Sequence, residues 1–187
     1  MIIKDKYKLK TKCEPVSSIE EGEEIAAQLF KELGDKGIGL AANQIGINKR
    51  VCVINVKEPI AFINPKITKS EGEIVAPEQC LSFPKKMVRT KRSKYVTIES
   101  DNHGTIILGG DQYDDNLLES ICAQHEIDHL DGITMFDREI KNMPFKRSSK
   151  KIGRNEKIDI EKDGVIKTLK YKKAETLIED GWNIINV

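Results

Sequence analysis

The chain has 187 residues, of which 39% are hydrophobic and 33% charged, and its formal net charge at neutral pH is +1. This length predicts one main domain with at most a small appendage, and the balanced charge excludes a molecule that attracts polyanions over its whole surface. No apolar run approaches the roughly 20 residues that span a membrane, and the first ten residues lack a signal-peptide pattern. The four cysteines form no C-x-x-C pair, so we expect a cytosolic protein with free thiols.

In chain order, the first predicted element is a helix over residues 19–33, with Ser18 and Glu21 as a capping box and Gly34 at its end. Residues 50–107 contain alternating and β-branched stretches that predict strands, with DNHG as a hairpin turn. A second helix is expected over residues 116–130, capped by Asn116 and followed by Gly132. The residues assigned to its buried face are Leu117, Leu118, Ile121 and Cys122. Strands gathered between two helices predict an α+β fold, with antiparallel or mixed strands around the second helix.

The stretch SICAQHEIDHLDG, residues 120–132, contains two of the three histidines in the chain. His125 and His129 lie four positions apart, so on a helix their imidazoles can point to one metal ion. Glu126 follows the first histidine, in the place of a general base in the H-E-x-x-H pattern. The competing interpretation is a chance match on an amphipathic helix, which we consider less favoured because histidine is rare here.

A catalytic site of the zinc type normally has three protein ligands and one open position, so a third ligand is required. The longer H-E-x-x-H-x-x-G-x-x-H motif is excluded, because a methionine stands in the last histidine's place. Four residues compete for the role. His103 is expected to be exposed in the DNHG turn, Cys122 lies about 10 Å from His129 along the helix axis, and no second ligand-bearing helix surrounds Glu139. Cys80 lies in PEQCLSFP, an extended segment with prolines on both sides.

The stretch DKGIGLAANQIG, residues 35–46, is the third notable pattern. Gly37 and Gly39 flank Ile38 and permit close approach of the backbone to a ligand. Taken alone, this stretch is equally well explained as an ordinary loop after the first helix. For Cys80 the competing interpretation is a small buried hydrophobic residue, which is what a lone cysteine usually is.

Together and in this order, GIGLAANQ, EQCLS and QHEIDHLDG resemble the three motifs of the peptide deformylase family, over roughly residues 1–145. The resemblance implies a metallohydrolase that removes the N-formyl group from the N-terminal formyl-methionine of nascent polypeptides and releases formate. It implies that Cys80, His125 and His129 hold one divalent metal ion. Fe²⁺ would be the native ion, with Zn²⁺, Ni²⁺ or Co²⁺ as substitutes.

The resemblance also assigns roles to residues around the metal. Glu126 would be the acid/base residue, and Gln44 with the backbone N–H of Leu81 would donate to the formyl oxygen as it becomes an oxyanion. The backbone around Ile38 would bind the extended peptide as an added strand. The residues implied in binding the peptide and its methionine side chain are Gly37, Ile38, Gly39, Leu81, Ile121 and Cys122.

Two departures from the family pattern stand out. Gln79 replaces the glycine of E-G-C-L-S, next to the expected metal and peptide groove. The tail differs too, because eleven basic and four acidic residues lie between Lys146 and Lys173. We expect a catalytic domain over residues 1–148 and a basic mini-module over residues 149–187, with a hairpin around Asp163 and Gly164, a short helix and a final strand.

The expected partners are N-formyl-methionyl nascent peptides, with no membrane, in the cytosol of a bacterium or of a phage-infected host. The basic tail suggests ribosome contact, and a solvated hairpin with ordinary surface lysines is the competing interpretation. Two other functions stay open. One is a metallopeptidase that cleaves ordinary peptide bonds, and the other is a non-catalytic metal-binding or ribosome-associated protein derived from a deformylase.

Overall fold

The computed structural model describes residues 1–141, 155–162, 165–179 and 182–186. Its internal contacts divide the chain into two compact units, Met1–Met143 and Pro144–Val187. The domain boundary expected between residues 148 and 149 lies outside the described residues. Within the described part of the chain, none of the helices is long and apolar enough to cross a membrane.

The first unit begins with the short 3₁₀ helix η1 (Lys8–Lys10) and the helix α1 (Ile19–Leu33), which has the predicted bounds. The Ser18 hydroxyl accepts a hydrogen bond from the Glu21 N–H, but the Glu21 carboxylate accepts from the Ser17 N–H, so only half of the expected capping box forms. Gly34 ends the helix with a φ of 45° and donates its N–H to the Phe30 carbonyl. This left-handed φ favours glycine, which explains the residue choice at the helix end.

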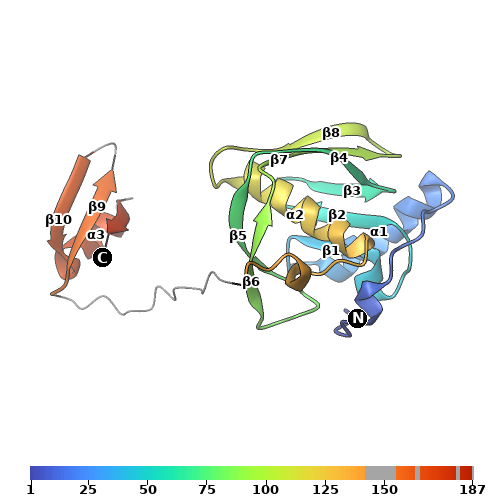
Figure 1. Cartoon of the computed structure of the whole chain (residues 1–187), viewed down its shortest axis with the longest axis horizontal. Helices are drawn as coiled ribbons and strands as arrows, with labels where there is room; N and C mark the ends of the chain where they lie inside the picture. Colours follow the sequence, from blue (N-terminus) through green and yellow to red (C-terminus); the bar gives the residue numbers. More distant parts are fainter. Residues whose placement is uncertain (142–154, 163–164, 180–181, 187) are drawn as a thin grey trace. The chain divides into compact units, whose positions relative to one another are not determined.

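Strands of the first unit form three antiparallel sheets (Figure 1). One sheet has the order β1-β2-β3, from β1 (Gly39–Ala41), β2 (Val51–Asn55) and β3 (Pro59–Ile63). A second has the order β4-β7-β8, from β4 (Lys66–Glu71), β7 (Tyr95–Ser100) and β8 (Gly104–Gly109). The third is the hairpin of β5 (Ile74–Gln79) and β6 (Met87–Arg92). The predicted DNHG turn joins β7 to β8, whose ends pair at Ser100 and Gly104.

The helix α2 (Asp115–Leu130) begins one residue earlier than predicted. Its N-cap is Asp114 and not Asn116, because the Asp114 carboxylate accepts hydrogen bonds from the N–H groups of Asn116 and Leu117. Leu118 was also assigned wrongly, since it is only half-buried and lines a cavity. Gly132 follows the helix with a φ of 73°, and a Cβ there would lie 2.4 Å from the Lys10 carbonyl oxygen. Only glycine therefore permits this close packing against η1.

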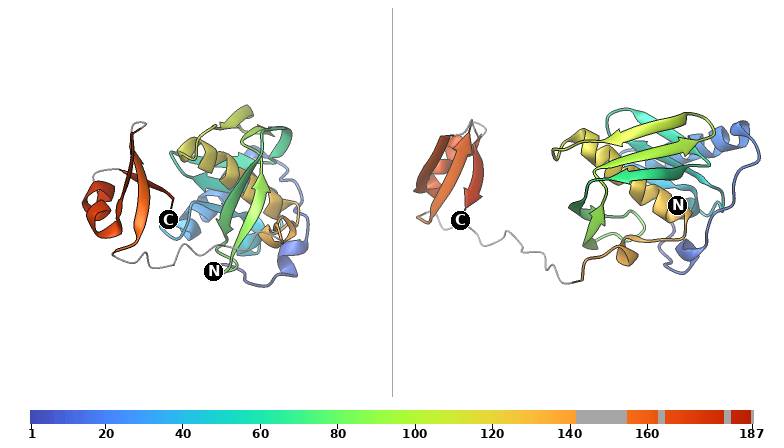
Figure 2. Two further views of the ribbon diagram at one scale, coloured as in Figure 1. Left: turned by 60° about the vertical axis from the view of Figure 1, so that its left-hand side comes forward. Right: turned by 45° about the horizontal axis from the view of Figure 1, so that its top comes forward.

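Helix α2 lies between the sheets, and α1 covers the outer face of the sheet β1-β2-β3 (Figures 1 and 2). Along β2, Cys52 and Ile54 pack toward α2, whereas Val51 and Val53 pack toward α1. Both faces of β2 are thus buried, which explains its uninterrupted apolar run. Because α2 is enclosed along nearly its whole length, its polar residues need partners inside the protein.

Two further 3₁₀ helices belong to the first unit: η2 (Ala42–Ile45) follows β1, and η3 (Met135–Asp137) follows α2.

The second unit contains β9 (Lys157–Lys162), β10 (Val165–Lys170), α3 (Tyr171–Glu179) and β11 (Asn183–Asn186), with the antiparallel sheet order β10-β9-β11. These elements agree with the predicted hairpin, short helix and final strand, although the turn at residues 163–164 is outside the described residues. Its small core consists of Ile158, Ile160 and Ala174, with Leu169, Tyr171, Leu177, Ile178 and Trp182 packed against them.

Candidate active site

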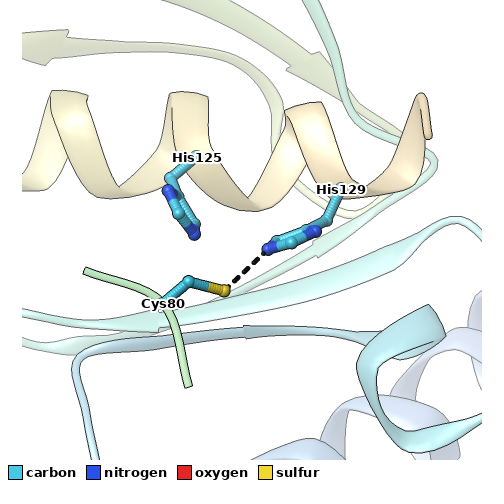
Figure 3. A group of neighbouring side chains, drawn as sticks. All are labelled: Cys80, His125 and His129. Atoms are coloured by element: carbon cyan, nitrogen blue, oxygen red, sulfur yellow. Dashed lines mark hydrogen bonds between the residues drawn. The ribbon is translucent and has the colours of Figure 1, made fainter. Parts of the chain in front are cut away.

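Three side chains from two elements converge beside α2 (Figure 3). His125 and His129 project from one face of this helix, and Cys80 approaches them from the segment that follows β5. Their potential ligand atoms all lie within 4.8 Å of one another, and all three residues are buried. The Cys80 Sγ is 3.2 Å from the His129 Nε2. A thiolate and two imidazoles at this separation form a donor set that suits one tetrahedral metal ion with a free position.

The other three residues considered as a third ligand lie elsewhere. His103 is exposed in the β7–β8 turn, where its ring meets the edge of Phe62 at a centroid distance of 6.1 Å. Glu139 is exposed beyond η3. Cys122 is buried, and its thiol donates to the Ile38 carbonyl oxygen at 3.3 Å. Folding therefore places Cys80, rather than these three, beside the two histidines.

Glu78 is a site residue that sequence reasoning missed. Its carboxylate lies 2.7 Å from the His125 Nδ1, and it also accepts hydrogen bonds from the Arg92 guanidinium and the Thr90 hydroxyl. Burial opposes ionisation of this carboxyl, but the contacts with His125 and Arg92 prevail and hold its pKa well below the usual range. Glu78 fixes the ring of His125 with the Nε2 available to the cluster. Strand alternation is the one sequence pattern that could have indicated Glu78. Residues two positions apart on a strand point to the same face, so Glu78 is expected on the same side as Cys80.

Arg92 extends this network away from the cluster. Its guanidinium also contacts the buried Asp128 on α2, whose other oxygen accepts from the Arg138 guanidinium at 2.7 Å. Burying a charged group without partners is costly, so these ion pairs hold the β5–β6 hairpin against α2. The hairpin in turn positions the segment that carries Cys80.

Glu126 occupies a buried position beside the cluster, and its Oε2 has no hydrogen-bond partner among the described residues. Burial, reinforced by the nearby charge of Glu78, raises its pKa to about 7 although His125 opposes the shift. Gly39 makes room for this carboxylate, because a Cβ at that position would lie 2.5 Å from the Glu126 Oε1 and 2.7 Å from the Cys122 Sγ. The carboxylate is thus placed to exchange a proton with a ligand at the cluster.

The side chain of Gln44 is fixed with its donor toward Cys80. The Gln44 Oε1 accepts from the Ala41 N–H at 2.8 Å, and its Nε2 lies 3.1 Å from the Ser82 hydroxyl and 3.4 Å from the Cys80 Sγ. Since a carboxamide has one acceptor end and one donor end, the bond to β1 determines which end faces the cluster.

Asn43 connects this loop to α2. Its side-chain amide donates to the His129 carbonyl oxygen at 2.6 Å.

Burial lowers the pKa of the His129 imidazole well below its usual value, and the neighbouring His125 adds to this effect. His129 is therefore neutral, which is the form that binds a metal ion.

A cavity of about 570 Å³ opens beside the cluster. A larger one of about 840 Å³ lies against the opposite face of α2, and none of the three cluster residues lines it. All the residues expected to bind the substrate or the oxyanion line the smaller cavity, namely Gly37, Ile38, Gly39, Gln44, Leu81, Ile121 and Cys122, and so do Cys80, His125 and Glu126.

Two features shape the entrance of this cavity. The strand β1 is the edge of its sheet, and the carbonyl of the preceding Ile38 already accepts from the Asn55 N–H at 2.7 Å. Gln79 is exposed and pairs across the hairpin with Met87, and both residues line the cavity. Gln79 therefore points away from the face that carries Glu78 and Cys80.

Comparison with known proteins bears out the resemblance in the three motifs. The family model described as polypeptide deformylase matches residues 1–161, which extends beyond the expected 145 into β9. The chain is 36% identical over 155 residues to the peptide deformylase of Blochmanniella pennsylvanica, covering 78% of this chain and 85% of the relative. It is 46% identical over 106 residues to that of Heliobacterium modesticaldum, covering 55% and 67%.

Solved structures give the same result for the fold. A peptide deformylase from Plasmodium falciparum superposes with a TM-score of 0.67 at 29% identity, covering 75% of this chain and 87% of the other. A deformylase from the Vibrio parahaemolyticus bacteriophage VP16T, solved in complex with actinonin, superposes with a TM-score of 0.61 at 33% identity, covering 71% and 98%. The chain therefore belongs to the polypeptide deformylase family, whose members are metal-dependent hydrolases that remove the N-formyl group from nascent polypeptides.

Proposed function

We propose that this chain hydrolyses the formyl amide of N-formyl-methionyl peptides at the cluster of Cys80, His125 and His129. The observation that carries the proposal is that Cys80 and His125 of this cluster line one cavity with Gln44, an oriented carboxamide donor, and with the buried Glu126, whose Oε2 has no hydrogen-bond partner among the described residues. The three ligand atoms suit one divalent ion, and the Glu78 contact to His125 is the support that metal-binding imidazoles typically have. We propose Fe²⁺ as the native ion, with Zn²⁺, Ni²⁺ or Co²⁺ as substitutes.

The side chains around the cluster divide the chemistry between them. Cys80, His125 and His129 would hold the divalent ion, which when bound would lower the pKa of a water to near 7 and so provide the nucleophile. Glu126 takes the proton from the attacking water and delivers it to the departing amine nitrogen, and a pKa of about 7 suits both directions of transfer. The Gln44 amide and the Leu81 backbone N–H donate to the formyl oxygen as negative charge develops there, which lowers the barrier by about 3–4 kcal/mol per donor. Formate and the free amino terminus are the products.

The substrate enters as an extended peptide beside β1. This strand is the edge of its sheet, so the peptide backbone can add to it as a further strand. Ile38, Ile121 and Cys122 contribute apolar surface to the same cavity. An unbranched thioether such as methionine adapts well to a cavity of this kind.

Two substitutions test the assigned roles. Glu126→Ala should keep the metal ion but lower turnover by about 10²- to 10⁴-fold, because the ligands remain while the proton carrier is lost.

Cys80→Ala should instead lose the metal ion itself, since two histidines alone bind it weakly. Metal analysis of anaerobically purified protein, combined with formate release from a formyl-Met-Ala-Ser peptide, measures both. A Cys80→Ala protein that retains stoichiometric metal and activity would show that Cys80 is not the third ligand.

The same assay separates the other two functions. A metallopeptidase would cleave the unformylated peptide at an internal bond, and a non-catalytic metal protein would release no formate. The convergence of Glu126 and Gln44 on the cluster favours a formyl amidase over both, because a purely structural metal has no use for a general base or an oxyanion donor.

We also propose that the second unit contacts ribosomal RNA in the cytosol of a bacterium or of a phage-infected host. Lys157 and Lys170 lie directly opposite each other across β9 and β10, an arrangement that like charges disfavour unless an anion lies nearby. Lys172 and Lys173 are exposed at the start of α3 and follow Lys170 closely. Several basic residues of the tail, at positions 146–154, lie outside the described residues. Phosphate is the anion that a nascent-chain enzyme meets at the ribosome.

A further inference from the structure

The charged residues at the exposed entrance of the 570 Å³ cavity are lysines. Among the residues that line it, Glu78 and Glu126 are buried at the inner end, whereas Lys36 and Lys85 are exposed. A peptide that leaves the cluster toward solvent therefore passes positive charge at the entrance. Side chains in this position change the affinity for charged residues of the substrate without touching the reacting atoms.

The two lysines differ in their own partners. The Lys36 ammonium donates to the Glu32 carbonyl at 2.6 Å and pairs with the Glu32 carboxylate at 3.1 Å, so its charge is compensated. For the Lys85 ammonium, no hydrogen bond or ion pair is formed within the ranges of the chain that the structure describes. Lys85 is therefore the entrance lysine whose charge is available to a ligand.

The backbone of Lys85 gives a second, independent reason to look for a role there. Its φ is 73°, in the left-handed region that a side chain with a Cβ rarely adopts. It lies in the turn between Cys80 and β6 that the Lys86 N–H closes by donating to the Phe83 carbonyl at 3.1 Å. Glycine would adopt this conformation at a lower cost. A lysine that occupies such a position beside a binding cavity indicates that its side chain contributes to function.

We infer that Lys85 makes this deformylase select peptides that carry an acidic side chain in one of the two residues after the formyl-methionine. The inference rests on the proposed function and names the substrate class of that site. In the proposed function the formyl group binds at Cys80 and Glu126, so the residues that follow it would extend toward the entrance, where Lys85 is exposed. An exposed ion pair in water changes kcat/KM by about two- to fivefold, and added salt reduces the effect.

The test compares C-terminally amidated formyl peptides, so that no terminal carboxylate imitates the acidic residue. Formyl-methionine is followed by two variable residues that carry aspartate, lysine or alanine at one position and alanine at the other. We expect kcat/KM for the wild-type enzyme to be about two- to fivefold higher with aspartate than with lysine at one of the two positions at low salt. Lys85→Glu should invert this ratio. Lys85→Gly, which suits the backbone conformation, should abolish it.

Lys86→Glu is the matched control, because Lys86 is the exposed neighbour that does not line the cavity. It changes the net charge by the same amount and should leave the ratio as in the wild type. A ratio near one in the wild type, a ratio that Lys85→Glu and Lys85→Gly leave unchanged, or an equal shift in Lys86→Glu would overturn the inference. In each of those cases the alanine peptide would still be hydrolysed. If even this peptide releases no formate, the proposed function fails first and the inference fails with it.

Discussion

Gln79 lines the cavity beside Cys80 but is not one of the three proposed metal ligands. It stands next to Cys80 but points to the opposite face of β5, where it is exposed and pairs with Met87. The glycine that the family pattern has at this position would leave the groove wider. We expect Gln79→Gly to change KM or kcat for formyl peptides while metal content stays the same. Steady-state kinetics over several peptides measures KM and kcat, and metal analysis in parallel measures the metal content. Unchanged kinetics would show that Gln79 has no effect on substrate binding or turnover.

Gly39 and Gly37 allow a comparison at the residue scale. A Cβ at Gly39 would meet the buried Glu126 carboxylate and Cys122 thiol at under 3 Å, whereas a Cβ at Gly37 would meet the flexible Leu81 side chain at 3.1 Å. We expect Gly39→Ala to lower the free energy of unfolding by about 1–3 kcal/mol and to reduce turnover sharply, because it displaces Glu126, the proposed general base. Gly37→Ala should have a clearly smaller effect on both. Urea unfolding and formate release compare the two variants, and equal effects would contradict the proposed contact.

Asp137 connects elements that are distant in the sequence. Its carboxylate caps η3 by accepting from the Thr134 N–H and hydroxyl, and it pairs with Lys10 of η1. Burial opposes ionisation, but the Lys10 and Thr134 contacts prevail and lower the pKa of Asp137 to about 2.

Because the folded-state pKa is lowered, this residue stabilises the fold above its unfolded pKa near 4, and the contribution is lost as the pH falls toward 2. We expect Asp137→Ala to lower the free energy of unfolding by about 1 kcal/mol at pH 7, a modest value because both partners are partly exposed. The difference in the free energy of unfolding between the wild type and the variant should become smaller as the pH falls below 5, and urea unfolding at several pH values measures it. If this difference does not change with pH, the ion pair and the cap do not contribute to the free energy of unfolding.

At the scale of the whole molecule, the basic second unit has its own core and its own sheet. We expect a chain truncated after Ser149 to hydrolyse short formyl peptides at the wild-type rate, because every residue of the proposed site belongs to the first unit. If the second unit contacts ribosomal RNA, the truncated enzyme should co-sediment with ribosomes less than the full chain at low salt, and added salt should remove the difference. Equal sedimentation of both forms would refute the ribosome contact. Aggregation of the truncated form would show that the tail stabilises the catalytic unit.

What the sequence determined by itself is what depends on near neighbours. The bounds of α1 and the pairing of His125 with His129 follow from helix periodicity and capping, which act over one or two turns. The start of α2 was misplaced because Asp114 and Asn116 are both good caps, and the backbone that decides between them is set by the preceding loop. The three motifs together also identified the family, which the comparison with known proteins confirmed.

Tertiary structure decided which distant groups meet. The family resemblance implied Cys80 as the third member of the cluster, but local patterns could not place it there. Cys80 is 45 positions from His125, and only the packing of the β5–β6 hairpin against α2 brings them together. The Glu78 contact to His125, the orientation of the Gln44 amide and the clearance at Gly39 likewise depend on contacts between separate elements. A periodic pattern records which face of an element is buried, but it does not record which partner covers that face. The partner is chosen by the packing of the whole core, where close-packed side chains and paired buried charges permit few arrangements.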